Sequence, residues 1–275
     1  RSPMKRAALA RWITDADSGA GQLAARVIVN RLWQHHFGRG IVSTPSDFGA
    51  QGDKPTHPEL LDYLAGELIR DGWSLKGMHK RMMMSKVYQE DAHVLSGEGA
   101  ADPNNTLFWR RNRQRLEGEA IRDSILAVSG LLDPTMFGPG TLDTAMKRRA
   151  IYFQIKRSAL PPMMIAFDAP DTLQSLGQRS STTVAPQSLL LMNNPLVREA
   201  AKSLAKRAGS IPSANSVRQV YLQVLNRDPT PAEAQMAFQF LVAQGAKYGE
   251  GDHSESAFVD FCQMLFGLNE FLYVR

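Results

Sequence analysis

Apolar residues recur every three or four positions along most of this chain, which is the spacing of one face of an α-helix. Residues 21–36 carry a broad apolar face that stops near Gly38, and Leu60, Leu64 and Leu68 repeat the pattern further on. The periodicity predicts helices over residues 4–14, 21–36, 56–72, 75–88, 115–129, 194–209, 216–226, 231–244 and 255–268.

Residues suited to helix starts stand at several of these borders. Thr56 is followed three residues later by Glu59, and Thr230 by Glu233, which is the capping-box spacing. Pro195 stands where a proline is tolerated in a first helical turn. We therefore expect helix caps at Thr56, Ser74, Asn194 and Thr230.

The predicted helices are separated by long polar stretches without a clean period. Residues 150–155 are the best strand candidate, and one strand alone does not make a sheet protein. We predict a mainly α fold, an irregular multi-helix bundle with long ordered loops and at most a minor β element. Residues 1–275 read as one helical domain, with an alternative of two lobes, 1–132 and 183–275, joined by an irregular segment, 133–182.

Composition and charge set further bounds. The chain of 275 residues is 43% hydrophobic and 21% charged, an ordinary globular mixture, and its longest apolar runs are too short to span a membrane. The net charge of +5 suggests a polyanion partner. The chain has no block of five consecutive like charges, however, so we do not expect nucleic acid as a partner. The opening residues show no signal segment.

Cysteine usage excludes two kinds of chemistry within this sequence. Cys262 is the single cysteine, so no intrachain disulfide and no Cys-x-x-Cys-His haem attachment can form. Phe258, Phe261 and Leu265 share its predicted helix face, which favours a core thiol. We expect no cofactor and no metal in this chain.

One candidate cluster lies on the helix over 21–36. Arg31, Trp33 and His35 are candidate ligand-binding residues there. His35 and His36 point about 100° apart on a helix, so they are poorly placed to chelate one metal together. Either one imidazole faces a cleft, or both are helix-end cations favoured by the helix dipole.

A second cluster is the stretch 109–115, which holds a tryptophan and four arginines. Guanidinium groups bind phosphate, sulfate and carboxylate through paired hydrogen bonds, and an aromatic ring can stack on a sugar or base. An alternative is an ion-pair ladder of Arg115, Glu119 and Asp123 along one helix face. The candidate ligand-binding residues are Trp109, Arg110, Arg113 and Arg115.

A third cluster follows Phe167. Asp168 and Asp171 are three residues apart and could bind a hard cation or act as acid and base, whereas turn formation and a helix cap at Thr183 are the alternative. Arg179 is a candidate anion ligand nearby. The weak catalytic candidates are Asp168, Asp171, Glu119 and Asp123.

An ordered set of short strings runs through the chain. It resembles the planctomycete PSD-one domain, known as domain of unknown function 1553. The strings include NRLWQHHFG (30–38), TPSDFG (44–49), HPELLD (57–62), GWSLK (72–76), RLEGEAIRD (115–123), FDAPD (167–171), TTVAPQ (182–187), MNNP (192–195) and NEFLYV (269–274).

The resemblance implies a C-terminal domain of a large exported protein, and hence an extracytoplasmic location. It also implies a cytochrome c-like module, with haem, elsewhere in the parent protein. It supplies no catalytic residues. We therefore expect a binding or accessory domain with polysaccharide as ligand. The alternatives are a hydrolytic or redox-coupled carbohydrate-active enzyme domain and a docking domain for the cytochrome module.

Overall fold

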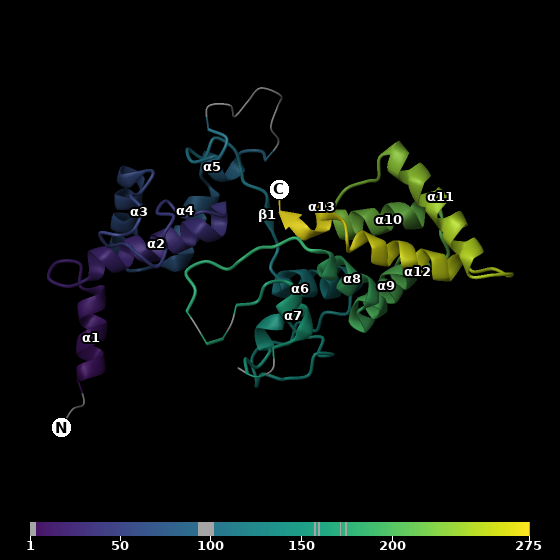
Figure 1. The fold of residues 1–275 in the computed structure, drawn as a ribbon, viewed down its shortest axis with the longest axis horizontal. Helices are drawn as coiled ribbons and strands as arrows, with labels where there is room; N and C mark the ends of the chain where they lie inside the picture. Colours follow the sequence, from purple (N-terminus) through teal and green to yellow (C-terminus); the bar gives the residue numbers. More distant parts are fainter. Residues whose placement is uncertain are drawn as a thin grey trace. The chain divides into compact units, whose positions relative to one another are not determined.

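The computed structural model describes residues 4–92, 102–156, 158, 160–170, 172–173 and 175–274. Within these residues the protein is mainly helical, with one small sheet of two strands, as the sequence predicts (Figure 1). The chain divides into two compact units. Unit 1 contains the residues up to Gln114 together with Leu176–Gln178, and unit 2 contains Arg115–Ser175 and Arg179–Val274.

Unit 1 is built around α2 and α3, which pack against each other along their apolar faces. Trp33, Phe37, Leu64 and Leu68 are buried between them, together with Met78 from the next helix. Its helices are α1 (Lys5–Thr14), α2 (Gly21–Phe37), α3 (Pro58–Arg70), α4 (Leu75–Met83) and α5 (Lys86–Gln89).

A buried asparagine holds the loop that follows α2. Asn30 is fully buried and uses its amide to accept from the backbone nitrogen of Val42 at 2.8 Å and donate to the Val42 carbonyl at 3.0 Å. The loop passes so close that a Cβ on Gly40 would lie 2.7 Å from the Asn30 amide nitrogen. Glycine is therefore required at this close approach.

Unit 2 has its own hydrophobic core between α6, α9 and α12. Ile125, Leu204 and Phe258 are fully buried there, and so is Cys262, as predicted. Its elements are α6 (Gly118–Ser129), the 3₁₀-helix η1 (Ala150–Tyr152), α7 (Pro162–Ala166), α8 (Ala185–Asn193), α9 (Pro195–Arg207), α10 (Ala214–Leu225), α11 (Pro231–Lys247), α12 (Ser254–Leu265) and α13 (Asn269–Leu272).

The small sheet pairs β1 (Gln114–Arg115) with β2 (Tyr273–Val274). The prediction of a strand over 150–155 is wrong, because the first three of these residues form η1. Only Phe153 makes an isolated bridge, to Thr141. Ile151 and Ile155 are exposed, so the apolar residues of 150–155 do not all face a core, although their hydrophobic character suggested a strand.

The observed units differ from the lobes considered from sequence. Those lobes place α6 in an N-terminal lobe ending at residue 132, whereas α6 belongs to unit 2. The reason is that Ile121 and Ile125 are fully buried in the unit 2 core. The irregular segment 133–182 likewise lies mostly in unit 2, with Leu176–Gln178 in unit 1.

Candidate functional site

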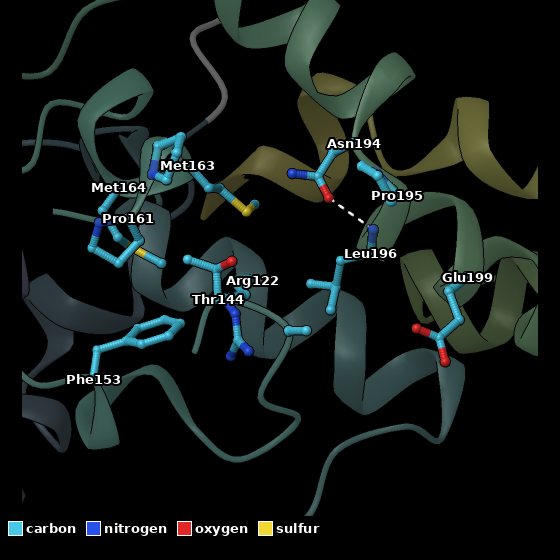
Figure 2. Close-up of a pocket in the computed structure, with 12 residues that line it drawn as sticks. Arg122, Thr144, Phe153, Pro161, Met163, Met164, Asn194, Pro195, Leu196 and Glu199 are labelled. Carbon is cyan, nitrogen blue, oxygen red and sulfur yellow. Dashed lines mark hydrogen bonds between the residues drawn. The ribbon is translucent and has the colours of Figure 1, made fainter. Parts of the chain in front are cut away.

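Unit 2 contains a cavity of about 370 Å³ lined by parts of α6, α7 and α9 and by residues 144, 145, 153 and 161 (Figure 2). Phe153, Met163, Met164 and Leu196 give it an apolar wall, together with three prolines. A few polar side chains, from Arg122, Thr144, Asn194 and Glu199, complete the lining. Small-molecule sites have this size and this combination of apolar wall and few polar groups.

Arg122 is the buried cation of this wall, with 2% of its surface exposed. Its Nη1 donates to the Arg148 carbonyl at 2.9 Å, Nη2 donates to the Met146 carbonyl, and the guanidinium carbon lies 4.8 Å from the Phe153 ring centroid. Burial lowers the pKa of Arg122, while neighbouring Asp123 acts in the opposite direction. Since both terminal nitrogens already donate to carbonyls, Arg122 mainly fixes the segment that closes the cavity.

Asn194 offers donors to the cavity. Its Oδ1 caps α9 by accepting from the backbone nitrogens of Leu196 at 2.9 Å and Val197 at 3.4 Å. This cap fixes which end of the amide is oxygen, and Nδ2 then points to the side of Met163 (Figure 2). Nδ2 donates no hydrogen bond to any residue that the structure describes.

Glu199 is the acidic group of the lining. It is half exposed, and its carboxylate pairs with Lys147, which is also partly exposed. An ion pair this accessible is weak and readily exchanged for another partner. Glu199 can therefore take part in binding at the edge of the cavity.

Three segments singled out from the sequence meet at Arg179, in the same unit. Arg179 donates from Nη1 to Glu119 at 2.8 Å, with Glu117 at 3.3 Å, and from Nε and Nη2 to the carbonyls of Asp168 and Phe167 at 2.8 and 3.0 Å. The Asp168 carboxylate accepts from Thr182, whose backbone nitrogen is 2.7 Å away. These charged groups bind protein partners, so the arrangement joins α6 to the turn after α7.

Arg115 extends this arrangement toward β2 at the C-terminal end of the chain. Its guanidinium lies between the rings of Phe167 and Tyr273, 5.3 and 5.7 Å from their centroids. It donates to the Thr182 carbonyl and to the Thr183 hydroxyl, which is also 2.9 Å from the Tyr273 hydroxyl. The Thr183 side chain is thus used here and does not cap α8, which corrects the predicted cap.

The predicted ladder of Arg115, Glu119 and Asp123 does not form. Helix α6 begins at Gly118, so Arg115 is not on it. Glu119 pairs with Arg179, and Asp123 accepts from the backbone nitrogen of Ala150 at 2.7 Å. The remaining acidic candidate, Asp171, lies outside the described residues.

In unit 1, the α2 candidates occupy two different environments. Arg31 and His35 are exposed. Trp33 is 4% exposed in the unit 1 core, stacked on Phe37 with ring centroids 4.0 Å apart. A ligand outside the folded core would therefore meet Arg31 and His35 but not the Trp33 ring.

The stretch 109–115 is partly open to solvent. Trp109 is half-buried and donates from Nε1 to the Asp102 carbonyl at 3.0 Å, and the Arg110 guanidinium lies 5.3 Å from its ring centroid. Arg113 is exposed. Within the described ranges none of Trp109, Arg110 and Arg113 takes part in an ion pair.

Sequence reasoning did not find the residues of the cavity wall. Met163, Met164 and Phe153 come from a stretch without periodicity. Arg122 stands close to the charged residues at 115, 119 and 123, and the sequence does not distinguish it from them. Asn194 was identified only as a helix cap. The one available signal was its place before Pro195, which identifies it as a cap. A capping asparagine uses its amide oxygen for the helix, and the amide nitrogen can then donate to another partner.

Two further kinds of feature are absent from the described residues. In the part of the chain with described coordinates, no group of three or more histidine, cysteine, aspartate or glutamate side chains could hold a metal ion. None of the helices in the same residues combines the length and apolar character needed to cross a bilayer.

The fold and the cavity define a mainly helical protein of two units, with a ligand-sized space in the second. Residues 5–241 match the family PSD1, described as a protein of unknown function (DUF1553), and the chain belongs to that family. Neither the curated proteins nor the solved structures contain a match to this chain.

Proposed function

We propose that this member of the DUF1553 family is a binding module whose unit 2 cavity takes a small ligand with an apolar body and an acceptor oxygen. The observation that carries the proposal is the cavity of about 370 Å³ with the Asn194 amide facing it. Phe153, Met163 and Met164 would contact the apolar body, and Asn194 Nδ2 would donate to the oxygen.

The acidic residues favour binding over hydrolysis. Glu119, Asp123 and Asp168 are not among the residues that line the cavity, and each accepts hydrogen bonds from protein groups. A hydrolase of glycosidic bonds needs two carboxyl groups facing one cleft. Glu199 is the single carboxylate in the described lining, which is one too few for that chemistry.

A thermal-shift screen of the intact protein tests the proposal. The screen would hold small neutral and acidic organic compounds and short glycans, and a compound that binds only the folded state raises the melting temperature. Ala145→Trp places a large ring at an exposed position of the cavity lining. Ala243→Trp makes the same change at an exposed position on α11 outside the lining, and serves as control.

The expected result is a shift that Ala145→Trp abolishes and Ala243→Trp preserves. A ligand that stabilises both variants equally would place its site elsewhere and contradict the proposal. So would the absence of any shift across a screen that reaches millimolar concentrations.

Polysaccharide binding by the stretch 109–115 is a second proposal. It is favoured by the half-buried Trp109 and by the exposed Arg113, which takes part in no ion pair among the described residues. Retention on an acidic polysaccharide column should fall in Arg113→Gln and stay unchanged in Arg11→Gln, an exposed arginine on α1. Equal retention of the two variants would show that retention depends only on net charge, and would contradict a binding site at 109–115.

The resemblance supplies a cellular setting for these proposals. An extracytoplasmic location and a parent protein with a cytochrome c-like module would bring the binding module to ligands outside the cell, with any haem in that other module. Localisation of a tagged parent protein by cell fractionation tests this setting. Recovery in the cytoplasmic fraction would contradict it.

A further inference from the structure

The apolar wall of the unit 2 cavity is made mostly of rings and thioethers. These are the side chains of Phe153, Pro161, Pro162, Met163, Met164 and Pro195. Figure 2 shows Phe153 and Met164 on one side of the space and Leu196 on the other. Thioethers make favourable contacts with aromatic rings, and prolines hold their backbone rigid. A lining of this kind favours a ligand with a flat aromatic body.

The charges of the lining already have opposite charges close to them. Among the described residues that line the cavity, the charged ones are Arg122 and Glu199. Arg122 donates to two main-chain carbonyls, and its Nη1 lies 3.5 Å from Oδ1 of Asp123. Glu199 pairs with Lys147. An ionised ligand would bring one more charge into a largely apolar space, which costs free energy unless that charge finds a partner of its own.

Asn194 gives the cavity a polar group without charge. Its Oδ1 accepts from the backbone nitrogens of Leu196 and Val197, so turning the amide over would cost α9 its cap. Nδ2 therefore stays on the side of the cavity (Figure 2). A neutral N–H suits the carbonyl oxygen of an amide or ester. It offsets little of the hydration that a carboxylate loses, and it offers no acceptor to an ammonium group.

We propose that the cavity takes an uncharged aromatic amide or ester, and that Asn194 selects for its carbonyl oxygen. This assignment rests on the binding function proposed for the cavity, and adds the charge of the ligand and the residue that sets specificity. The aromatic ring lies among the methionines and prolines, and the carbonyl oxygen accepts from Asn194 Nδ2. A carboxylic acid and a primary amine of the same shape bind less tightly, because both are ionised at pH 7.

Three compounds with one carbon skeleton test the assignment: 3-phenylpropanamide, 3-phenylpropanoate and 3-phenylpropylamine. Each is titrated at pH 7 into the intact, ¹⁵N-labelled protein, and the side-chain amide signals of asparagine are followed by NMR. We expect the amide to bind about tenfold more tightly than the acid or the amine. It should also move one side-chain amide signal that is missing from the spectrum of Asn194→Asp.

Asn194→Asp should reverse the preference among the three compounds. Aspartate caps a helix as well as asparagine does, so α9 keeps its start, but the donor is replaced by a charged acceptor. Binding of the amide should weaken about tenfold, and the amine should become the tightest ligand.

Asn193→Asp is the matched control. Asn193 is exposed, is not among the lining residues, and donates from Nδ2 to the Leu189 carbonyl. The substitution makes the same change of charge one position away, and should leave the preference for the amide unchanged.

Two results would overturn the assignment and leave the cavity as a ligand site, provided that Ala145→Trp abolishes the binding. One is acid or amine binding as tight as that of the amide, and the other is amide binding that Asn194→Asp does not weaken. If none of the three binds but another compound does so in the cavity, the assignment is also wrong. If no compound binds in the cavity, the binding function itself fails. The unchanged protein compares the three compounds whether or not Asn194→Asp folds.

Discussion

Arg122 shows how one buried charge can hold a long irregular segment in place. Its guanidinium binds the carbonyls of Met146 and Arg148, and the neighbouring Asp123 carboxylate accepts from the backbone nitrogen of Ala150. Together they fix both sides of the segment that closes the cavity. Arg122 stabilises the fold here only while all its partners remain, because each lost donor leaves a partly buried carbonyl without its hydrogen bond.

Replacing Arg122 by methionine should therefore destabilise the protein. Arg122→Met keeps much of the side-chain volume but leaves two carbonyls without their donor, and we expect the free energy of unfolding to fall by about 2–4 kcal/mol. Arg149→Met, at a side chain that is 64% exposed, should change it by less than about 0.5 kcal/mol. Urea denaturation measures both, and equal effects would contradict this role of Arg122.

Cys262 should be chemically silent in the folded protein. Its thiol is fully buried in the unit 2 core, and burial raises its pKa to about 12. The reactive thiolate is therefore scarce at pH 8. We expect a thiol reagent such as DTNB to label one cysteine per chain in denaturant and almost none in buffer. Fast labelling of the folded protein would show that unit 2 opens readily.

Helix packing reverses the usual effect of one glycine substitution. A Cβ on Gly118, in the first turn of α6, would lie 2.9 Å from the Cβ of Phe167. The gain in helix propensity from alanine, about 1 kcal/mol, is then outweighed by a clash costing about 1–3 kcal/mol. Gly118→Ala should thus lower the melting temperature.

Gly245 is the matched control within α11. Nothing lies within 4 Å of a Cβ built there, so Gly245→Ala should raise the unfolding free energy by about 0.5–1 kcal/mol. Differential scanning calorimetry compares the two variants. Stabilisation by Gly118→Ala would mean that α6 and α7 pack less closely than the structure shows.

The ion pairs at the start of α11 should make the free energy of unfolding depend on pH in the acidic range. Arg227 binds Glu233 and Glu270, and its hydrogen bonds, with those from Thr230, lower the pKa of Glu233 from 4.5 to about 2. A carboxylate with a lowered pKa stabilises the fold above its unfolded pKa, and this contribution is lost as the pH falls from about 5 toward 2.

Glu233→Gln should therefore cost about 1 kcal/mol at pH 7 and very little near pH 2. Glu250→Gln, at an exposed glutamate of the loop after α11, should give no pH-dependent difference. Chemical denaturation across this pH range measures both. A cost that stays constant down to pH 2 would show that the carboxylate charge is not its cause.

Local signals predicted the elements well where the partner of a side chain is close in sequence. Ser74, Asn194 and Thr230 cap their helices as expected, since a cap needs only a backbone nitrogen two or three residues away. Thr56 does not cap α3, because the N-cap position is one residue later, at His57, and the Thr56 hydroxyl donates to the Ile41 carbonyl. That partner is 15 residues distant and invisible to a local pattern.

The candidate site could be predicted far less well, because its residues meet only through the fold. Arg179 reaches Glu119 across 60 positions, and Arg115 reaches Thr183 across 68. The sequence singled out these residues by chemical type but supplied no pairing between them. The cavity wall gave still less, since methionine and proline in an aperiodic segment look the same whether they line a cavity or cover a surface.

Two separate cores should give the whole protein two separable unfolding signals. The buried clusters around Leu68 in unit 1 and Leu204 in unit 2 share no residue. All four tryptophans precede residue 114 and so belong to unit 1, whereas the helices of both units contribute to circular dichroism. Tryptophan fluorescence therefore reports on unit 1 alone.

Leu204→Ala should destabilise unit 2 by about 2–5 kcal/mol, because it leaves a cavity in a fully buried position. We expect the circular dichroism transition in urea to split, with an early phase that the tryptophan fluorescence does not follow. Leu68→Ala is the mirror control, and it should move the fluorescence transition to lower urea. If Leu204→Ala shifts both signals together, the two cores unfold as one cooperative unit, and the binding proposed for each would then be coupled through stability.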